Sequence, residues 1–309
     1  MIKTITLNPA LDKTIILDEF RSGQVNRVKK IFKDAGGKGI NVSKMIRNLG
    51  GRSIATGVLA GATGSFIKNE LERMEIEHNF IESTGETRTN LKLVDLRSNT
   101  FTDINEKGAF LLAKKLEELE ALIFNDLEKD DLLVLSGSVP AGVSEHIYED
   151  WINKAKGLQI KTILDVDGPL FKNGVKAGPT LIKPNNHELS AYFSTEMIDR
   201  EVIINSAVKL FEYGVEMIMV SLGSAGAIFL TADKRIVIEP LSLDVKSTVG
   251  AGDAMVGALA LGITEGMGME EMITLSVAAS SASLLNNGTE MGTKDQILNL
   301  KSQIKYYYL

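Results

Sequence analysis

The chain has 309 residues, of which 44% are hydrophobic and 24% charged, with a formal net charge of −6 and no cysteine. This length allows one large α/β domain, with or without a small accessory domain. The acidic balance argues against nucleic-acid binding, and the lack of cysteine excludes disulfides, thiolate metal sites and cysteine catalysis. Met1–Leu7 reads as a strand without a signal-peptide core, and no apolar run is long enough to span a membrane, so we expect a cytoplasmic protein without membrane partners.

Short apolar runs alternate with segments of helical periodicity along the chain. This alternation predicts an α/β fold of βαβ units with a mainly parallel sheet, with strands at residues 2–7, 54–59, 132–136, 161–166, 180–182 and 216–221. A helix is expected from Gly39 to Leu49, where apolar residues recur every three or four positions and two glycines follow. A second helix, from Asp253 to Ile263, is apolar on most faces, so we expect it to be buried.

Two stretches do not follow the βα alternation. Residues 14–33 and 87–105 are strand-like and more polar, and they flank helices. We predict that they pair into a small sheet that acts as a lid, formed by about residues 13–35 and 87–105 of a single domain spanning residues 1–309. Two ordinary surface hairpins are the alternative.

The strongest chemical signal is Ser247–Asp253 (STVGAGD), which opens the second helix. Its glycines let the backbone turn sharply, and the N–H groups and dipole of a helix N-terminus attract an anion. A carboxylate at the start of the helix can accept a proton from a hydroxyl held beside that anion. Phosphoryl transfer needs these parts, although an aspartate that merely caps the helix is the alternative for this segment alone.

A second glycine-rich segment, Gly36–Val42 (GGKGINV), opens the first helix. Its glycines allow a ligand to approach the backbone, Lys38 supplies a charge suited to a phosphate, and the amide of Asn41 could bind sugar hydroxyls. The segment is not a Walker loop, because the pattern Gly-x-x-x-x-Gly-Lys-Ser/Thr is absent from it. A glycine turn with a solvated lysine is the alternative.

Two further segments follow strands. In Lys183–Glu188 (KPNNHE), Asn185 and Glu188 are three residues apart, so on a helical turn they share a face and could organise the water ligands of magnesium near a triphosphate. A helix cap is the alternative there. Ser221–Ala227 (SLGSAGA) is a glycine loop between two strands that could approach a nucleotide, although a plain hairpin would look the same.

Two isolated residues complete the candidates. Asp12 follows the first strand and could hold sugar hydroxyls, while Arg88 could bind a phosphate with two hydrogen bonds. A turn aspartate and a solvated strand arginine are the alternatives. The three histidines do not have the spacing of metal ligands.

In combination, these motifs resemble the phosphofructokinase B family of the ribokinase-like fold. The resemblance runs from Thr6 to about Gly288 and is carried in order by TLNP, GGKGINV, TRTN, SGSVP, KPN, SLG and TVGAGD. The order and spacing of these motifs are highly specific. The resemblance implies a three-layer α/β/α core with a mainly parallel sheet and a small β-sheet lid.

The resemblance also implies roles for individual residues. Asp253 would be the catalytic base, and an anion hole would be formed by the N–H groups of Gly250, Ala251 and Gly252. ATP and Mg²⁺ would be bound by Lys183, Asn185, Glu188, Ser221, Gly223, Gly226, Thr248 and Asn286, with the metal near Asn185 and Glu188. The sugar phosphate would be held by Asp12, Gly37, Lys38, Asn41, Arg88, Asn90 and Ser138. Such kinases often form homodimers through the lid, which would bring Arg27 toward a neighbouring site.

The implied activity is ATP-dependent phosphorylation of a ketohexose phosphate. Lys38, Asp103 and the segment Thr89–Leu93 resemble the 1-phosphofructokinase branch, which converts fructose 1-phosphate into fructose 1,6-bisphosphate. Thr89 departs from the isoleucine common in that branch, and Val277–Thr289 resembles the 6-phosphofructokinase branch, so tagatose 6-phosphate and fructose 6-phosphate stay open as substrates.

Two other functions are the alternatives to this activity. A catalytically silent sugar-phosphate sensor would keep the sugar site and lose the base or the anion hole, and both are intact here. A ribose or nucleoside kinase would leave the charges of Lys38 and Arg88 unpaired.

Overall fold

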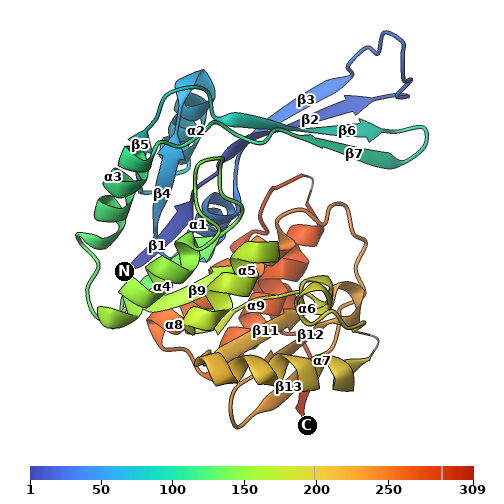
Figure 1. The fold of residues 1–309 in the computed structure, drawn as a ribbon. Coiled ribbons are helices and arrows are strands. Elements are labelled where there is room, and N and C mark those ends of the chain that lie inside the picture. The colour runs from blue at the N-terminus through green and yellow to red at the C-terminus, as the bar shows by residue number, and fades with distance from the viewer. Residues whose placement is uncertain (198, 287) are drawn as a thin grey trace.

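The computed structural model describes residues 1–197, 199–286 and 288–309, and a large sheet runs through its centre (Figure 1). Ten strands of the described residues join it in the order β14-β13-β12-β11-β10-β9-β8-β1-β4-β5. Neighbours from β11 to β5 pair in parallel, and β12 to β14 extend one edge with antiparallel pairs. The strands are β1 (Ile2–Thr6), β4 (Ile54–Leu59), β5 (His78–Glu82), β8 (Leu132–Ser136), β9 (Lys161–Asp165), β10 (Leu181–Ile182), β11 (Met217–Ser221), β12 (Ala227–Leu230), β13 (Arg235–Ile238) and β14 (Tyr306–Tyr308).

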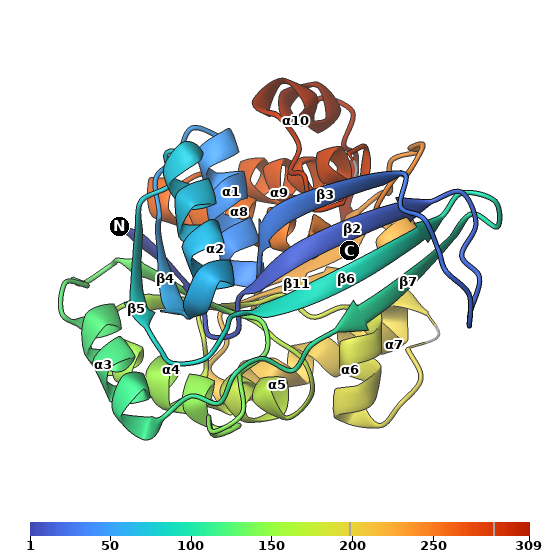
Figure 2. The same cartoon turned by 90° about the horizontal axis from the view of Figure 1, so that it is seen from above.

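Helices cover both faces of this sheet, because its central strands are apolar on both sides. On β8, Leu133 and Leu135 face the layer of α3 to α7, while Leu132 and Val134 face α1 and α8, against which α9 packs, with α10 outside α9 (Figure 2). The helices are α1 (Lys38–Asn48), α2 (Gly61–Arg73), α3 (Ala113–Phe124), α4 (Ile147–Gly157), α5 (Gly168–Gly174), α6 (Asn186–Phe193), α7 (Arg200–Ala207), α8 (Ala251–Glu265), α9 (Met269–Leu284) and α10 (Lys294–Lys301). The predicted three-layer α/β/α core is confirmed.

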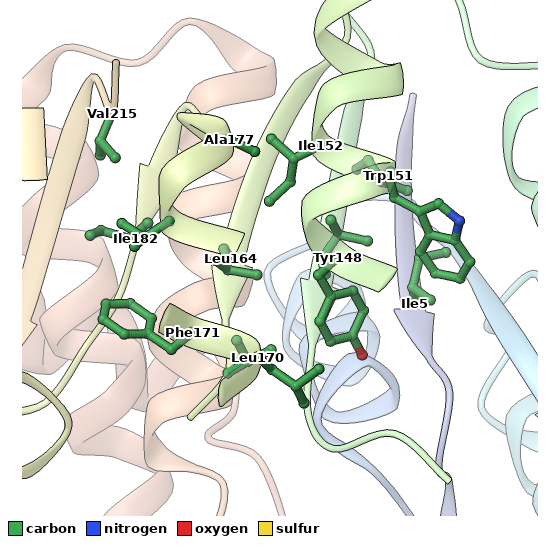
Figure 3. Packing of buried hydrophobic residues seen from close by; sticks show 14 of the residues in the cluster. Ile5, Tyr148, Trp151, Ile152, Leu164, Leu170, Phe171, Ala177, Ile182 and Val215 are labelled. Atoms are coloured by element: carbon green, nitrogen blue, oxygen red, sulfur yellow. The ribbon is translucent and has the colours of Figure 1, made fainter. Parts of the chain in front are cut away.

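Aromatic packing under α4 helps to position the loop after β8. Tyr148 and Trp151 are both buried and meet edge to face with ring centroids 6.1 Å apart (Figure 3). The hydroxyl of Tyr148 donates to the carbonyl oxygen of Gly137 at 3.2 Å. The core therefore holds the Ser136–Ser138 turn from below.

A second, smaller sheet projects from one end of the core (Figure 1). Its strand order is β3-β2-β6-β7, and it is built from β2 (Ala10–Leu17), β3 (Lys30–Gly36), β6 (Arg88–Asp95) and β7 (Thr100–Asn105). Register places Asp12, Asn90 and Asp34 on one face. The opposite face carries Ile15, Leu93 and other apolar side chains.

The predicted elements agree with the structure to within two residues at most ends. The strand expected at residues 180–182 is reduced to Leu181–Ile182, and the first helix begins at Lys38. The buried helix α8 contains the predicted span from Asp253 to Ile263. Across residues 1–197, 199–286 and 288–309, every helix is too short or too polar to cross a bilayer.

Candidate active site

The site lies where the parallel strands of the main sheet end, the position at which α/β sheets bind ligands. Strand β9 ends in Asp165, and β10 leads directly into Lys183. Helix α8 begins nearby, after Gly250, whose φ of 79° is in the left-handed region that glycine adopts at low cost. Chain segments far apart in the sequence are thereby brought to one edge.

Asp253 is in the first turn of α8 and is only 7% exposed. The helix is capped by Gly250, and the carboxylate of Asp253 instead accepts a hydrogen bond of 2.8 Å from Nδ2 of Asn41 in α1. The alternative in which this aspartate caps its own helix therefore does not describe the structure. Asp253 and Asn41 form one polar unit between two helices.

The surroundings of Asp253 tune its proton affinity. Burial, helped by the negative charge of Asp165, raises the pKa of Asp253 to about 6. The charges of Lys38 and Lys183 and the hydrogen bond from Asn41 oppose this rise. A carboxylate with such a pKa is ionised near neutral pH yet basic enough to take a proton, as a general base requires.

Two lysines flank a buried aspartate beside this group. Asp165 is 1% exposed, with Oδ1 3.1 Å from Nζ of Lys183 and Oδ2 3.4 Å from Nζ of Lys38. Burial would raise the pKa of Asp165, but Lys183 and Lys38 outweigh it and hold that pKa below its ordinary value. The ammonium of Lys183 also lies 3.4 Å from where a Cβ on Gly252 would be, so it adjoins the glycine loop.

Lys38 belongs to the same cluster. Burial lowers the pKa of Lys38, but the carboxylates of Asp165, Asp253 and Glu188 outweigh this and raise it above its ordinary value. The family motifs predicted that Lys38 holds the sugar phosphate, whereas its ammonium lies 3.4 Å from the carboxylate of Asp165. Its charge therefore lies beside the group that would take the proton.

Asp165 is not among the residues that the motifs predicted for the site. Its signal was available, because the residue lies within the predicted strand at 161–166, close to its carboxyl end. The carboxyl ends of parallel strands meet at the ligand-binding edge. A polar residue at that end of a buried strand is therefore a signal of a site residue.

Asn185 and Glu188 form a capping box at the start of α6. Oδ1 of Asn185 accepts from the backbone N–H of Glu188 at 2.8 Å, and Oε2 of Glu188 accepts from that of Asn185 at 2.9 Å. The capping alternative for this segment is therefore present. It leaves Oε1 of Glu188 available, and burial raises the pKa of Glu188 while the charge of Lys183 offsets part of that effect.

The donor set fits a magnesium ion that is held mainly by other ligands. In the described part of the chain, no group of three or more His, Asp or Glu side chains could hold a metal by itself. Mg²⁺ bound with nucleotides typically uses one or two protein carboxylates together with water and phosphate oxygens. Glu188, half-buried and in the charge field of Lys183, can supply one such contact.

The small sheet and α1 contribute polar groups that await a partner. Nδ2 of Asn90 donates to Oδ1 of Asp12 at 3.0 Å across β2 and β6. Burial raises the pKa of Asp12, and the hydrogen bond from Asn90 reduces this effect. Among the described residues, Oδ1 of Asn41 and Oδ1 of Asn90 are buried without a hydrogen-bond partner. Ligand hydroxyls would satisfy both oxygens.

Other predicted sugar-site residues line the base of this region. Nε of Arg88 donates to the carbonyl oxygen of Asn8 at 3.2 Å, and Nδ2 of Asn8 donates to Oγ of Ser138 at 3.2 Å. Gly37 has a φ of 119°, and a Cβ there would lie 2.6 Å from Cγ2 of Thr6. Only glycine fits at that position without a shift.

The residues predicted for the nucleotide are more dispersed. Ser221 donates its N–H to the carbonyl oxygen of Pro184 at 3.0 Å, which places the end of β11 beside the Lys183–Glu188 segment. Thr248 is exposed in the loop before α8, and a Cβ on Gly223 would meet open space.

Three residues predicted for the nucleotide or the neighbouring site, Gly226, Asn286 and Arg27, lie among other groups than the charged residues around Asp253. Glycine is required at position 226 by the fold, because a Cβ there would lie 2.2 Å from the carbonyl oxygen of Ile238. Nδ2 of Asn286 lies 3.5 Å from its acceptor on Gln296. Arg27 is exposed in the loop between β2 and β3. The contacts within the site pair Asn41 with Asp253 and join Lys38 to Lys183 through Asp165, and they do not include these three residues.

Comparison with known proteins agrees with this geometry. The pfkB family carbohydrate kinase model matches residues 5–296. The chain is 32% identical over 307 residues to the 1-phosphofructokinase of Bacillus subtilis, covering 99% of each protein. It is 36% identical over 287 residues to the 1-phosphofructokinase of Xanthomonas campestris, covering 91% of this chain and 90% of that protein.

A solved structure is similar over almost the whole chain. Phosphofructokinase-2 from Escherichia coli, in complex with substrates and products, aligns with a TM-score of 0.93 and 32% sequence identity, covering 98% of both chains. The ribokinase-like fold expected from the motifs is thereby confirmed. The protein belongs to the pfkB family of carbohydrate kinases, enzymes that transfer a phosphoryl group to an alcohol.

Proposed function

We propose that the protein transfers the γ-phosphoryl group of ATP to the free primary hydroxyl of fructose 1-phosphate, giving fructose 1,6-bisphosphate and ADP. The observation that carries phosphoryl transfer is the buried carboxylate of Asp253 at a glycine-opened helix start, flanked by the charges of Lys38 and Lys183. The choice of substrate rests on relatives named 1-phosphofructokinase. Asp103, which resembles the 1-phosphofructokinase branch, supports the same substrate. It lies on the polar face of the small sheet, 3.7 Å from Lys92.

In the proposed reaction, Asp253 accepts the proton of the sugar hydroxyl. The hydroxyl oxygen then forms a bond to the γ-phosphorus as the bond to the bridging oxygen of ADP breaks. Backbone N–H groups at residues 250–252 face the transferring group, where the helix dipole favours negative charge. Lys38 and Lys183 offset the charge that spreads over the phosphoryl oxygens.

Mg²⁺ would be held by Glu188, and by Asn185 through water, together with ATP oxygens. When bound, such an ion neutralises the phosphate oxygens and favours the departure of ADP. The protein's own part is to orient Glu188, which the capping box does through two reciprocal hydrogen bonds.

The sugar would be held between α1 and the small sheet. The unpaired amide oxygens of Asn41 and Asn90 are suited to accept from its hydroxyls, and Asp12 to accept from another. Arg88 and Ser138 would receive the phosphate already on the sugar. The small sheet would act as the lid, formed by about residues 13–35 and 87–105 of a single domain, and would exclude water from the transfer.

The outer face of the small sheet is suited to a second copy of the chain. Ile31 and Ile104 are 46% and 50% exposed on it, beside half-buried Leu91 and Leu93. Asp34 on the opposite face contacts the core, so this apolar face points away from it. Covering such a face is a common reason for dimer formation.

The test is a coupled assay of ADP release by the purified protein with magnesium-ATP. Fructose 1-phosphate, fructose 6-phosphate, tagatose 6-phosphate, fructose and ribose are compared by kcat/KM. We expect fructose 1-phosphate to exceed every other acceptor by about tenfold or more, since a missing charged contact is worth over about 1.4 kcal/mol. A preference for a 6-phosphate would overturn the substrate, and no turnover with any acceptor would overturn the proposed kinase activity.

Replacing the base tests the mechanism. Asp253→Asn keeps the shape and the contact with Asn41 but cannot take a proton, so kcat is expected to fall by about a hundredfold to ten-thousandfold. ATP binding, measured by calorimetry, should change little. The matched control is Asp199→Asn, since this residue caps α7 by accepting from the N–H of Val202 and asparagine caps equally well. Turnover of Asp253→Asn at the level of this control would contradict the role of the base.

A further inference from the structure

A polar contact joins the small sheet to the opposite side of the candidate site. Asp34 lies near the end of β3, on the same face as Asp12. Its Oδ2 accepts a hydrogen bond of 2.8 Å from Oγ1 of Thr289, a residue 255 positions away that follows α9. Its Oδ1 lies 3.3 Å from Nζ of Lys44 in α1. One carboxylate thus contacts two elements outside its own sheet.

The segment that carries Thr289 also contacts the glycine loop. The hydroxyl of Ser247 donates to the carbonyl oxygen of Gly288 at 2.9 Å. The same hydroxyl accepts from the backbone N–H of Val249 at 3.3 Å. Val249 directly precedes Gly250, the cap of α8. Two adjacent residues, Gly288 and Thr289, therefore connect β3 with the loop that leads to Asp253.

Lys44 gives this connection its charge balance. It is 6% exposed, and its ammonium also donates to the carbonyl oxygen of Ala35 at 2.6 Å. A buried ammonium needs a nearby carboxylate, and Asp34 supplies one. Lys44 is three residues from Asn41 on α1, so the two side chains lie on one side of the helix. The amide of Asn41 contacts Asp253, and the ammonium of Lys44 contacts Asp34.

We propose that Asp34, Lys44 and Thr289 are positioning residues for the transfer reaction. Together they fix the small sheet, with the acceptor hydroxyl that it holds, relative to the loop that carries Asp253. None of the three contacts the reacting atoms. The inference rests on the proposed function in one respect, namely that the acceptor is bound between α1 and the small sheet.

The first test removes the hydroxyl and keeps the shape. Thr289→Val is expected to lower kcat by about tenfold to a hundredfold, because a misplacement of about 1 Å has effects of this size. The KM values for the sugar phosphate and for ATP should stay near those of the unchanged protein, since each substrate keeps its own contacts. Thr289→Ser retains the donor and should restore kcat.

A buried threonine elsewhere provides the matched control. Thr274 in α9 is also buried, and its hydroxyl donates to the backbone carbonyl oxygen of Glu270 at 2.7 Å. Thr274→Val should leave kcat unchanged. The proposal is overturned if Thr289→Val keeps full kcat, if Thr289→Ser loses as much as Thr289→Val, or if Thr274→Val loses as much as Thr289→Val.

A double-mutant cycle tests whether the contact itself is responsible. If Thr289 acts through Asp34, Thr289→Val combined with Asp34→Asn should lower kcat no further than the more damaging single change. If the loss of kcat in the double variant equals the product of the two single losses, Thr289 does not act through Asp34.

Amide hydrogen exchange gives a readout that does not depend on catalysis. The N–H of Lys246 donates to the carbonyl oxygen of Leu284 at 2.8 Å, so exchange across residues 246–250 reports on the order of the glycine loop. We expect faster exchange there in Thr289→Val than in Thr274→Val. Equal exchange in Thr289→Val and Thr274→Val would overturn the proposal. This readout does not require turnover of any sugar. A protein without turnover would therefore count against the proposed function alone.

Discussion

Asp165 sets the charge balance at the centre of the site. Its carboxylate separates two ammonium groups, and it also raises the pKa of Asp253 through its negative charge. A buried lysine without a carboxylate is costly. The aspartate therefore acts on Lys38, Lys183 and Asp253 simultaneously.

Removing this charge should shift the pH dependence of the reaction in a defined direction. Asp165→Asn takes a negative charge away from Asp253, which favours its ionised form and lowers its pKa from about 6. The acidic limb of kcat/KM should therefore move to lower pH, while kcat at neutral pH falls because the lysines lose their anchor. The profile is recorded with one substrate for all variants, so the titration of the substrate phosphate is common to them.

An exposed aspartate two residues away is the control for this change. Asp167 is solvent-exposed at the N-cap position of α5, where its charge is screened and its side chain makes no capping hydrogen bond that asparagine would lose. Asp167→Asn should leave the acidic limb in place. A limb for Asp165→Asn that stays in place, or that moves to higher pH, would contradict this account of Asp253.

Local motifs predicted the residues that lie in glycine segments and failed for the residue that does not. Asp253, Lys38 and Asn41 stand in short patterns whose backbone geometry is itself informative. Asp165 ends an ordinary buried strand, and its contact with Lys38 spans 127 residues. Such pairing depends on the order of strands in the sheet, which the sequence pattern did not give.

At the scale of elements, two helix starts meet the same physical requirement in different ways. Both α6 and α8 have N–H groups that their own helix cannot satisfy. In α6, the capping box of Asn185 and Glu188 occupies some of them. In α8 the cap is Gly250, which has no side chain, so the N–H groups stay available to an anion.

The capping box allows the structural and chemical roles of Glu188 to be separated. Glu188→Gln keeps an oxygen that can accept from the N–H of Asn185, so the cap should survive. Glu188→Ala loses the hydrogen bond from the N–H of Asn185, while Oδ1 of Asn185 still accepts from the backbone N–H at position 188, so the free energy of unfolding should fall by about 1 kcal/mol at most. Both variants lose the carboxylate proposed to contact Mg²⁺.

We therefore expect Glu188→Gln to unfold at nearly the same temperature as the unchanged protein but to need more magnesium for half-maximal rate. Thermal unfolding and a magnesium titration of the rate measure the two effects. Normal magnesium dependence in Glu188→Gln would show that the residue is only a cap and would remove it from the proposed metal contacts.

The pattern of elements was predicted better than their pairing. Apolar runs marked the parallel strands, because strands buried on both faces must be apolar throughout. Of the antiparallel edge, only the pair of β11 and β12 was foreseen, as the hairpin alternative for Ser221–Ala227. The strand β14 (Tyr306–Tyr308) was not predicted, since it is short and exposed and reaches β13 only through the fold. The second sheet was expected, but its register, which places Asp12 beside Asn90, was not.

At the scale of the whole molecule, the small sheet has two faces with different tasks. The face toward the core carries the polar groups of the site, including Asp12, Asn90 and Asp34. The face away from the core carries Ile31 and Ile104, both about half exposed. Stable association of two chains usually buries roughly 800 Å² on each partner. We propose that a second copy of the chain packs against this face and buries its apolar side chains.

Charge on that face should therefore dissociate the protein. The double change Ile31→Glu and Ile104→Glu places two carboxylates where each chain would meet the other, and burying unpaired charge is costly. Light scattering coupled to gel filtration should give the mass of a dimer for the unchanged protein and of a monomer for this variant. Leu298→Glu, at a residue of similar exposure on α10, should remain a dimer. A double variant that stays dimeric would place the association on another surface, and a monomeric unchanged protein would leave the apolar face without its proposed partner.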